Sequence, residues 1–125
     1  MKRTLAIGVG TLSLAVSSVI GFSSTAQASP GQHCTLRDYF CLYEHDDFNE
    51  GASGTVREWS RVPDGRCKRT GSPNWASSMI NRSNRSVYMY DRDNCAGSHG
   101  YRARPDSHDA DFTNNGWDNK TNSIK

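Results

Sequence analysis

The sequence lacks the short motifs that mark the common hydrolase families. It contains no G-x-S-x-G nucleophile motif and no H-E-x-x-H metal motif, because Glu44 and His45 stand in the opposite order. Ser107, His108 and Asp109 are adjacent in the chain, but catalytic triads are assembled from distant segments, so this adjacency indicates nothing. We therefore expect that the protein is not an enzyme, with a small hydrolase built from scattered His and Asp residues as a rival interpretation.

The sequence also has no hydrophobic run that is a strong candidate for a membrane anchor. The run Leu5–Phe22 is near the lower length limit for a span, and its Gly and Ser residues make it weakly apolar. It follows the basic start Met1–Thr4 and precedes the A-x-A pattern Ala26–Ala28. This order is typical of a secretory signal peptide over residues 1–28, so we expect a secreted, extracellular protein that begins at Ser29.

The exported part has no excess of charge of either sign. The whole chain carries 15 Lys and Arg against 13 Asp and Glu, and Lys2 and Arg3 account for the difference. Residues 29–125 therefore have a formal net charge of zero. General binding to nucleic acid or to anionic membranes depends on net positive charge, so we expect neither partner after cleavage.

The four cysteines form no C-x2-C pair, and the four histidines stand near no cysteine pair at zinc-finger spacing, which argues against a zinc site. An even number of cysteines in a small secreted chain predicts disulfides, and four cysteines allow three connectivities. We favour Cys34–Cys41, which closes a short loop, and Cys67–Cys95, which ties a mid-chain loop to a later hairpin. Aliphatic residues are sparse after residue 29, so a small core gains from these cross-links.

An internal repeat organises the rest of the chain. Segments Cys41–Gly51 and Val87–Gly97 each contain an alternating run that ends in Tyr followed by an acidic residue, then a polar turn and a Gly. Tyr43 and Tyr90 are 47 residues apart. Two copies of such a unit predict two folded hairpins in one small sandwich domain.

The local patterns predict short strands and almost no helix. Alternation places Cys41 and Tyr43 on one face and Leu42 on the other, as in a half-buried strand. Gly54–Trp59 is a further strand candidate, and residues 98–116 consist mostly of turn formers. We expect any helix in the latter segment to be a single turn.

The repeat resembles the Greek-key motif of the βγ-crystallins, and more closely the secreted, crystallin-like peptidase-inhibitor family of actinobacteria, typified by a metalloproteinase inhibitor. The segments that carry this resemblance are Phe40–Glu44, Ala76–Ser78 and Asn119–Ile124. It implies an all-β, disulfide-braced double Greek-key sandwich in one monomeric domain over residues 29–125, with repeats at about 33–80 and 81–125. It also implies inhibition of an extracellular protease.

One departure from the motif is visible in the first hairpin. Gly51 stands eight positions after Tyr43, whereas Gly97 stands seven after Tyr90. We therefore expect the tips of the two hairpins to differ in shape.

No motif in this sequence matches the reactive residues of that family. We therefore choose residues 61–73 as the candidate inhibitory segment from the amino acids that the segment contains. Arg66, Lys68 and Arg69 surround Cys67 and form the most basic stretch of the chain. These basic residues suit an acidic, trypsin-type specificity pocket. Val62 is the apolar residue that would suit a metalloproteinase. The alternative interpretation is a solvated connection between strands.

The resemblance to βγ-crystallins also implies calcium sites, with a motif of two Asn or Asp residues, two free positions, Ser or Thr, and Ser. Asp118–Ser123 has Asn122 in place of a hydroxyl, and Pro73–Ser78 has Pro73 in place of the first polar residue. The candidate ligands are Asn74, Ser77, Asp118, Asn119 and Ser123. We favour the alternative that these side chains hydrogen-bond the neighbouring hairpin, so that calcium binds weakly and no cofactor is required.

These observations favour a secreted peptidase inhibitor. Two other functions stay open on the same fold: a calcium-stabilised structural or stress protein, and an antimicrobial or toxin-like protein. The identity of the target protease does not follow from the sequence.

Overall fold

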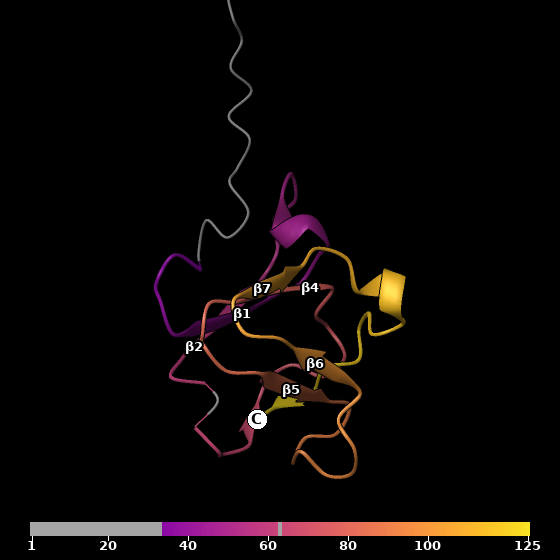
Figure 1. Cartoon of the computed structure of the whole chain (residues 1–125). Helices are drawn as coiled ribbons and strands as arrows, with labels where there is room; N and C mark the ends of the chain where they lie inside the picture. The colour runs from indigo at the N-terminus through magenta and orange to yellow at the C-terminus, as the bar shows by residue number, and fades with distance from the viewer. Residues whose placement is uncertain (1–33, 63) are drawn as a thin grey trace, which may run out of the picture.

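The computed structural model describes residues 34–62 and 64–125, which form two antiparallel four-stranded sheets stacked one above the other (Figure 1). The first sheet contains, in spatial order, β2 (Val56–Ser60), β1 (Tyr39–Tyr43), β4 (Ser78–Asn81) and β7 (Ser107–Asp109). The second contains β3 (Lys68–Arg69), β8 (Ser123–Ile124), β5 (Val87–Tyr90) and β6 (Tyr101–Ala103). The predicted signal peptide over residues 1–28 lies outside the described residues. Within the described ones, no helix is long and apolar enough to cross a membrane.

The two repeats exchange one strand each. In each repeat the third strand leaves its own sheet: β3 of the first repeat pairs with β8, and β7 of the second repeat pairs with β4. Each sheet therefore takes three strands from one repeat and one from the other, which is the double Greek-key arrangement expected from the sequence. Because each half supplies an edge strand to the other, the halves share one core.

The core lies between the sheets and consists of the inward-facing residues of both. Leu42 and Met79 of the first sheet and Met89 and Ile124 of the second are all at most 1% exposed. The same cluster holds these further residues: Phe40, Val62, Ala76, Val87, Ala103, Phe112 and Trp117. Burial of these few large side chains is the main favourable term in folding, at roughly 1.5–3 kcal/mol for each aliphatic or aromatic side chain.

The first strands of the two repeats, β1 and β5, differ in how their outer faces are covered. Alternation along β1 is as expected, but the prediction that this strand is half-buried is wrong, because Cys41 and Tyr43 on its outer face are 0% and 1% exposed. A second cluster covers that face: Cys34, Cys41, Tyr43 and Ile80, with Tyr39, Phe48 and Val56 packed against it. In β5, Val87 and Met89 are buried while Tyr88 and Tyr90 are only half-buried.

The hairpin tips differ, in line with the spacing of their glycines. In the first tip, the short 3-10 segment η1 (Asp47–Asn49) has three consecutive residues with positive φ of 46°, 58° and 62°. In the second tip, Cys95 with φ of 53° precedes Gly97. The left-handed conformation costs roughly 1 kcal/mol for a residue with a Cβ, so the first tip depends on its hydrogen bonds to the rest of the fold.

The segment between β7 and β8 contains one short helix, as predicted. This helix is the 3-10 turn η2 (Phe112–Asn115), and the Asp111 side chain caps it by accepting a hydrogen bond from the Thr113 N–H. The Thr113 hydroxyl donates to the same carboxylate, and this bond, followed by the one from the N–H, holds the pKa of Asp111 below its ordinary value. Phe112 is buried in the core, so the turn anchors the long connection.

Candidate functional site

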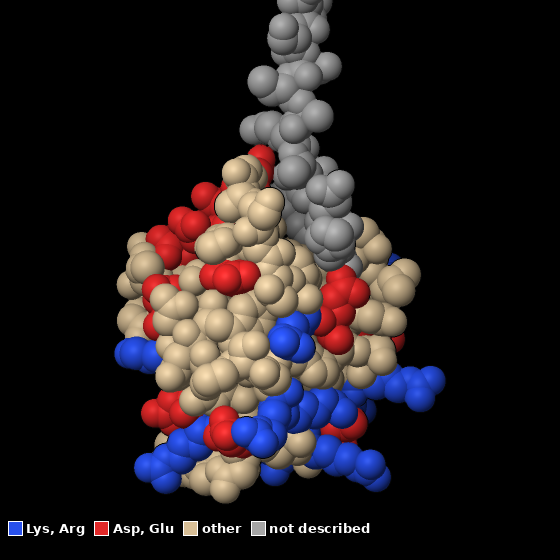
Figure 2. All heavy atoms as spheres, turned by 180° about the vertical axis from the view of Figure 1, so that it is seen from behind, with Lys and Arg blue, Asp and Glu red and all other residues tan. Residues whose placement is uncertain are grey.

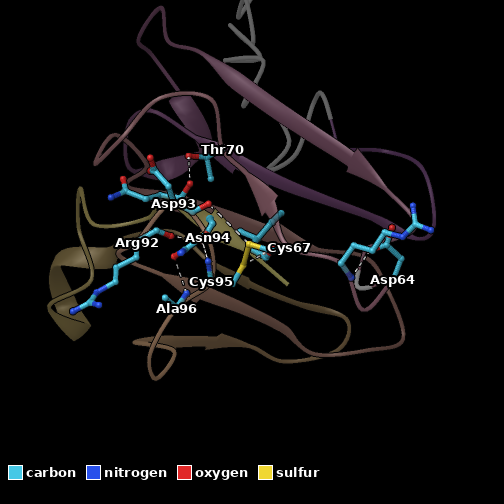
Figure 3. Close-up of a disulfide and its surroundings, with 12 residues drawn as sticks. Asp64, Cys67, Thr70, Arg92, Asp93, Asn94, Cys95 and Ala96 are labelled. Atoms are coloured by element: carbon cyan, nitrogen blue, oxygen red, sulfur yellow. Dashed lines mark hydrogen bonds between the residues drawn. A yellow bond between two sulfur atoms is a disulfide. The ribbon is translucent and has the colours of Figure 1, made fainter.

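The basic segment lies beside the second disulfide. The structure joins Cys67 to Cys95 and Cys34 to Cys41, the two pairings favoured from the sequence. The Cys67–Cys95 bond links the segment to the tip of the second hairpin, with Asp64 on one side and Asp93–Ala96 around it (Figure 3). A cross-link over 28 residues therefore fixes this part of the surface.

The segment over residues 61–73 is not one continuous loop, which corrects the sequence prediction. Lys68 and Arg69 form strand β3 and pair in register with Ile124 and Ser123 of β8. Their backbones pair with the second sheet because the edge of β8 offers hydrogen-bonding groups to them. Among the described residues, the non-strand part of the segment is therefore 61, 62 and 64–67, before β3, and the stretch that follows β3.

The side chains of the segment have different environments. Val62 is 2% exposed and belongs to the core, so the apolar candidate for a metalloproteinase contact is not available at the surface. Lys68 makes an ion pair of 2.9 Å with Asp64, and Arg69 makes one with Asp93. Arg66 is exposed, and among the described residues its side chain makes no hydrogen bond or ion pair.

Asp64 organises the turn that presents Arg66. Its carboxylate accepts a hydrogen bond of 2.9 Å from the Lys68 ammonium and one of 3.0 Å from the Arg66 backbone N–H. The Lys68 ammonium, followed by the Arg66 N–H, holds the pKa of Asp64 below its ordinary value. Gly65 between them has φ of 80°, a conformation that favours glycine. The tip around Asp64, Gly65 and Arg66 is therefore a tight turn.

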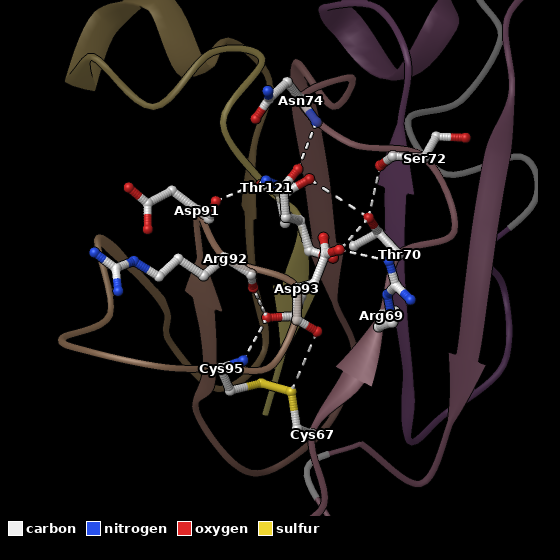
Figure 4. A network of polar contacts seen from close by, with 12 residues as sticks. Cys67, Arg69, Thr70, Ser72, Asn74, Asp91, Arg92, Asp93, Cys95 and Thr121 are labelled. Carbon is white, nitrogen blue, oxygen red and sulfur yellow. Dashed lines mark hydrogen bonds and ion pairs between the residues drawn. A yellow bond between two sulfur atoms is a disulfide. The ribbon is translucent and has the colours of Figure 1, made fainter.

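The stretch after β3 is held by a polar network that the sequence reasoning missed (Figure 4). Asn122 accepts the Asn74 N–H at 2.7 Å through its side-chain oxygen and donates its amide to the Asp91 carbonyl at 2.6 Å. Its backbone carbonyl accepts from the Thr70 N–H and hydroxyl at 3.0 and 3.1 Å. An amide has both a donor and an acceptor, which explains why an Asn, in place of the motif hydroxyl, joins the first-repeat segment to the second hairpin.

Arg57 of β2 supports the same stretch from the other side. Its guanidinium donates to the Ser72 hydroxyl at 3.3 Å and lies 5.9 Å from the centre of the Trp75 ring. A Cβ on Gly71 would stand 3.0 Å from the guanidinium, so the glycine allows this close approach. No local motif predicts this role for Arg57, because its partners Ser72 and Trp75 belong to the connection between β3 and β4.

The two candidate calcium segments lie side by side. The Asn119 N–H donates to the Ala76 carbonyl at 3.0 Å, and Asn74 is bonded to Asn122 as described above. Asn74 and Asn119 have equivalent left-handed conformations, with φ of 52° and 54°. The approximate two-fold symmetry of the repeats thus brings the two motifs together.

The final serine of each motif supports its own hairpin. Ser78 accepts a hydrogen bond of 3.2 Å from the Phe48 N–H and donates one of 2.6 Å to the His45 carbonyl. Ser123 accepts one of 3.0 Å from the Cys95 N–H and donates to the Arg92 carbonyl. The interpretation that these serines hydrogen-bond the folded hairpins is confirmed.

Among the remaining candidate calcium ligands, Asp118 is the carboxylate. Asp118 Oδ1 is buried without a hydrogen-bond partner, while Oδ2 accepts from the Asn119 amide at 2.8 Å. An orphaned carboxylate oxygen fits a cation. Among the described residues, no group of three or more His, Cys, Asp and Glu side chains is arranged to hold a metal. Ser77 contributes its backbone, donating to Tyr43 and accepting from Phe112. Asp118 is therefore the main contribution of this region to any calcium site.

Comparisons with known proteins agree with this architecture. A solved structure from work on the evolution of the eye lens beta-gamma-crystallin domain fold is similar to the chain, with a TM-score of 0.56 and 17% sequence identity over 71% of this chain and 84% of that one. The similarity identifies the fold as βγ-crystallin-like. A comparison with curated proteins gave no match.

The family model described as peptidase inhibitor family I36 matches residues 27–102, which include the first repeat, the basic segment, the second hairpin and both disulfides. The match covers more than half of the chain. Members of an inhibitor family are not enzymes, and their partners are proteases. The chain belongs to peptidase inhibitor family I36.

Proposed function

We propose that this protein inhibits an extracellular protease by inserting Arg66 into its specificity pocket. The single observation that carries the proposal is the contrast among the three basic side chains. Lys68 and Arg69 are paired with Asp64 and Asp93, whereas Arg66 is exposed on a braced turn and has no described partner. A free cation on an ordered turn can enter a protease pocket without breaking a contact of its own.

The surroundings of Arg66 support tight binding by reducing the entropy lost on association. The turn is held on one side by the Asp64 carboxylate and on the other by the Cys67–Cys95 bond. Ordering a segment before binding lowers the free-energy cost of the complex. Asn122 and Arg57 hold the stretch that follows β3, so both ends of the segment are anchored.

The chemistry of the exposed residue supports a trypsin-like target over a metalloproteinase. A trypsin-type pocket contains a carboxylate and accepts Arg or Lys. The apolar alternative, Val62, is in the core and cannot be offered to a protease without unfolding. We therefore propose a serine protease with an acidic specificity pocket as the target class.

A protease panel tests the proposal. The purified protein is assayed against trypsin, chymotrypsin and a thermolysin-type metalloproteinase, and we expect inhibition of trypsin alone. Arg66→Ala should weaken that inhibition by at least about 30-fold, because a central basic anchor contributes about 2 kcal/mol or more. Arg37→Ala is the matched control, since Arg37 is also an exposed arginine but lies in the turn before β1.

Two outcomes would contradict the proposal. If the protein inhibits the metalloproteinase and not trypsin, the reactive residue lies elsewhere on the surface. If trypsin is inhibited equally by the native protein and by a triple variant with Ala at Arg66, Lys68 and Arg69, the segment is only a connection. Thermal unfolding of each variant is measured alongside, so that a lost fold is not read as a lost contact.

The proposed site of action is outside the cell, after removal of residues 1–28. The two disulfides support this, because such bonds persist in oxidising compartments. Intact-mass measurement of the exported protein should give a chain that begins at Ser29 with all four cysteines oxidised. A mass that includes the leader would contradict the proposal.

A further inference from the structure

The outer face of the second sheet carries a groove that the inhibitory segment does not use. It has a volume of about 510 Å³. We call it the aromatic–basic groove, and its lining residues are Gly65, Arg85, Ser86, Tyr88, Tyr90, His99 and Lys125. The outer face of the equivalent strand β1 is covered by the cluster around Cys34 and Phe48, whereas the corresponding face of β5 is open.

The aromatic residues of the groove form one wall. The ring of His99 lies 4.5 Å from the ring of Tyr88 and 6.4 Å from that of Tyr90, measured between centroids, with edge-to-face geometry in both pairs. The Arg102 guanidinium lies over the Tyr88 ring at 5.9 Å. These contacts cover part of the ring surface of Tyr88.

The cations stand on both sides of this wall. Lys125 and Tyr88 exchange two backbone hydrogen bonds of 2.8 and 2.9 Å between β5 and the chain that follows β8, and Tyr88 pairs in register with Arg102 of β6. Neighbouring strands are about 4.8 Å apart, so the Lys125 and Arg102 backbones lie about 10 Å apart across the tyrosine. Arg85 adds a third cation.

No Asp or Glu side chain lines the groove, in contrast to other hollows of the described surface. Three other hollows among the described residues each include at least one aspartate: Asp38 and Asp64, Asp93, and Asp106. Lys and Arg also predominate on the lower part of the molecule in the view of Figure 2, at the level of the second sheet, while most acidic residues lie higher. The groove therefore complements a negatively charged ligand.

The polar groups of the groove indicate the kind of anion. Ser86, Tyr88 and Tyr90 carry hydroxyls, which both donate and accept hydrogen bonds. The Ser86 hydroxyl accepts a hydrogen bond of 3.0 Å from the Arg102 guanidinium and keeps its own proton to donate, and among the described residues neither tyrosine hydroxyl has a protein partner. A ligand that bears both hydroxyls and carboxylates satisfies such hydroxyls together with the flanking cations. A single-stranded nucleic acid needs free ring faces for stacking, and Arg102 covers one face of Tyr88.

We propose that the aromatic–basic groove binds an acidic polysaccharide, with sugar hydroxyls on Tyr88, Tyr90 and Ser86 and carboxylates on Arg85, Lys125 and Arg102. Such binding would hold the inhibitor on an extracellular matrix or cell wall. It uses no residue of the proposed protease contact, so the two activities are separable. Gly65 lies at the border of both surfaces and contributes no side chain to either.

Titration calorimetry with oligogalacturonate tests this assignment on the purified protein. We expect binding that weakens as salt is added, because exposed charges are screened. The double variant Arg85→Gln, Lys125→Gln should lose at least ten-fold in affinity, and Tyr88→Phe, which keeps the ring, should lose several-fold. The matched control Arg37→Gln, Lys120→Gln removes two exposed cations outside the groove and should change affinity less than two-fold.

Three further probes define the ligand class. Methyl-esterified oligogalacturonate keeps the hydroxyls without the charge and should bind at least ten-fold more weakly. Poly-glutamate and oligo-thymidylate carry charge without sugar carboxylates and should also bind more weakly. The proposal is overturned if the ester binds equally well, if either of the other polyanions binds as tightly, or if the groove and control variants lose affinity alike. Trypsin inhibition by the groove variants should be unchanged, which keeps this test separate from that of Arg66.

Discussion

Tyr43 and Tyr90 occupy equivalent positions in the two repeats, yet Tyr43 is 1% exposed while Tyr90 is half-buried beside an open groove. The difference comes from what covers the outer face of each strand. In the first repeat, Phe48 packs edge-on against Tyr43 at 5.6 Å between ring centroids, and the Cys34–Cys41 bond closes the remainder. The equivalent of Phe48 in the second repeat is Cys95, which is bonded to Cys67. The replacement of Phe48 by Cys95, together with the Cys34–Cys41 bond of the first repeat, therefore gives a covered face and an available one.

The first prediction concerns the Tyr43 hydroxyl, which is buried without a hydrogen-bond partner. Burial, followed by the nearby Glu58 carboxylate, raises the pKa of Tyr43 to about 12. The folded state therefore binds the phenolic proton more tightly than the unfolded state, whose pKa is the ordinary 10.0. This contribution to stability is fully present below about pH 10 and is lost as pH rises towards 12, by roughly 2–3 kcal/mol in all.

Tyr43→Phe checks this prediction. The variant removes an unsatisfied buried hydroxyl, so its free energy of unfolding at pH 7 should rise by about 1 kcal/mol. Its loss of stability between pH 9 and pH 11.5 should be smaller than in the native protein, with Tyr90→Phe as the half-buried control. Urea unfolding at several pH values provides the measurement, and equal pH dependence in all three proteins would contradict the prediction.

The second prediction concerns the two hairpin serines. Ser78→Ala and Ser123→Ala should each lower the free energy of unfolding by about 1–3 kcal/mol, because each leaves a part-buried N–H and a carbonyl without a partner. Ser77→Ala is the control, since the described hydrogen bonds of Ser77 use its backbone. Denaturant unfolding would refute the role of these serines if all three variants were equally stable.

The third prediction concerns the disulfides. Cys67→Ser with Cys95→Ser should lower the free energy of unfolding by about 3–4 kcal/mol in the chain-entropy model, because the bond closes a separation of 28 residues. Cys67 is exposed, so little packing is lost with it. The comparison pair Cys34→Ala with Cys41→Ala closes only 7 residues, but both cysteines are fully buried, so it should lose packing in addition to cross-linking.

These variants separate bracing of the reactive turn from global stability. If Arg66 needs an ordered turn, trypsin inhibition should fall in the Cys67 variant even where it is fully folded, and should persist in the Cys34 variant at the same folded fraction. Inhibition constants measured at low temperature, with circular dichroism to establish folding, decide between the two. Equal inhibition in both variants would show that the disulfide does not preorganise the turn.

The fourth prediction concerns calcium. We expect weak binding, in the range of about 0.1–1 mM that is usual for extracellular modules, because Asp118 offers one free oxygen and Ser123 is engaged by the hairpin. Asp118→Asn should weaken binding further, while Asp46→Asn, at an exposed position, should not. Calorimetry is the measurement, supported by a rise in melting temperature only at calcium well above the dissociation constant. Sub-micromolar binding at two sites would contradict this expectation.

Much of this protein follows from the sequence because the relevant signals are local. Alternation around Tyr43 and Tyr90, the turn glycines and the constant repeat spacing predicted two hairpins in one small sandwich, and the resemblance of the repeat to the βγ-crystallins implied the double Greek key. The even number of cysteines and their positions relative to the hairpins determined the favoured disulfide pairing. These signals survive without a structure because each depends on a few neighbouring residues or on a simple repeat.

The tertiary structure decided which of these residues are available for binding. Lys68 and Arg69 become an edge strand because β8, far along the chain, offers them backbone partners. The charge of Arg69 is paired with Asp93 of the second hairpin. Val62 enters the core, and Arg66 is left exposed on the turn. Whether a loop residue is free, paired or buried depends on segments that the local pattern does not contain. The same holds for the covered face of β1 and the open face of β5, whose sequences alternate alike.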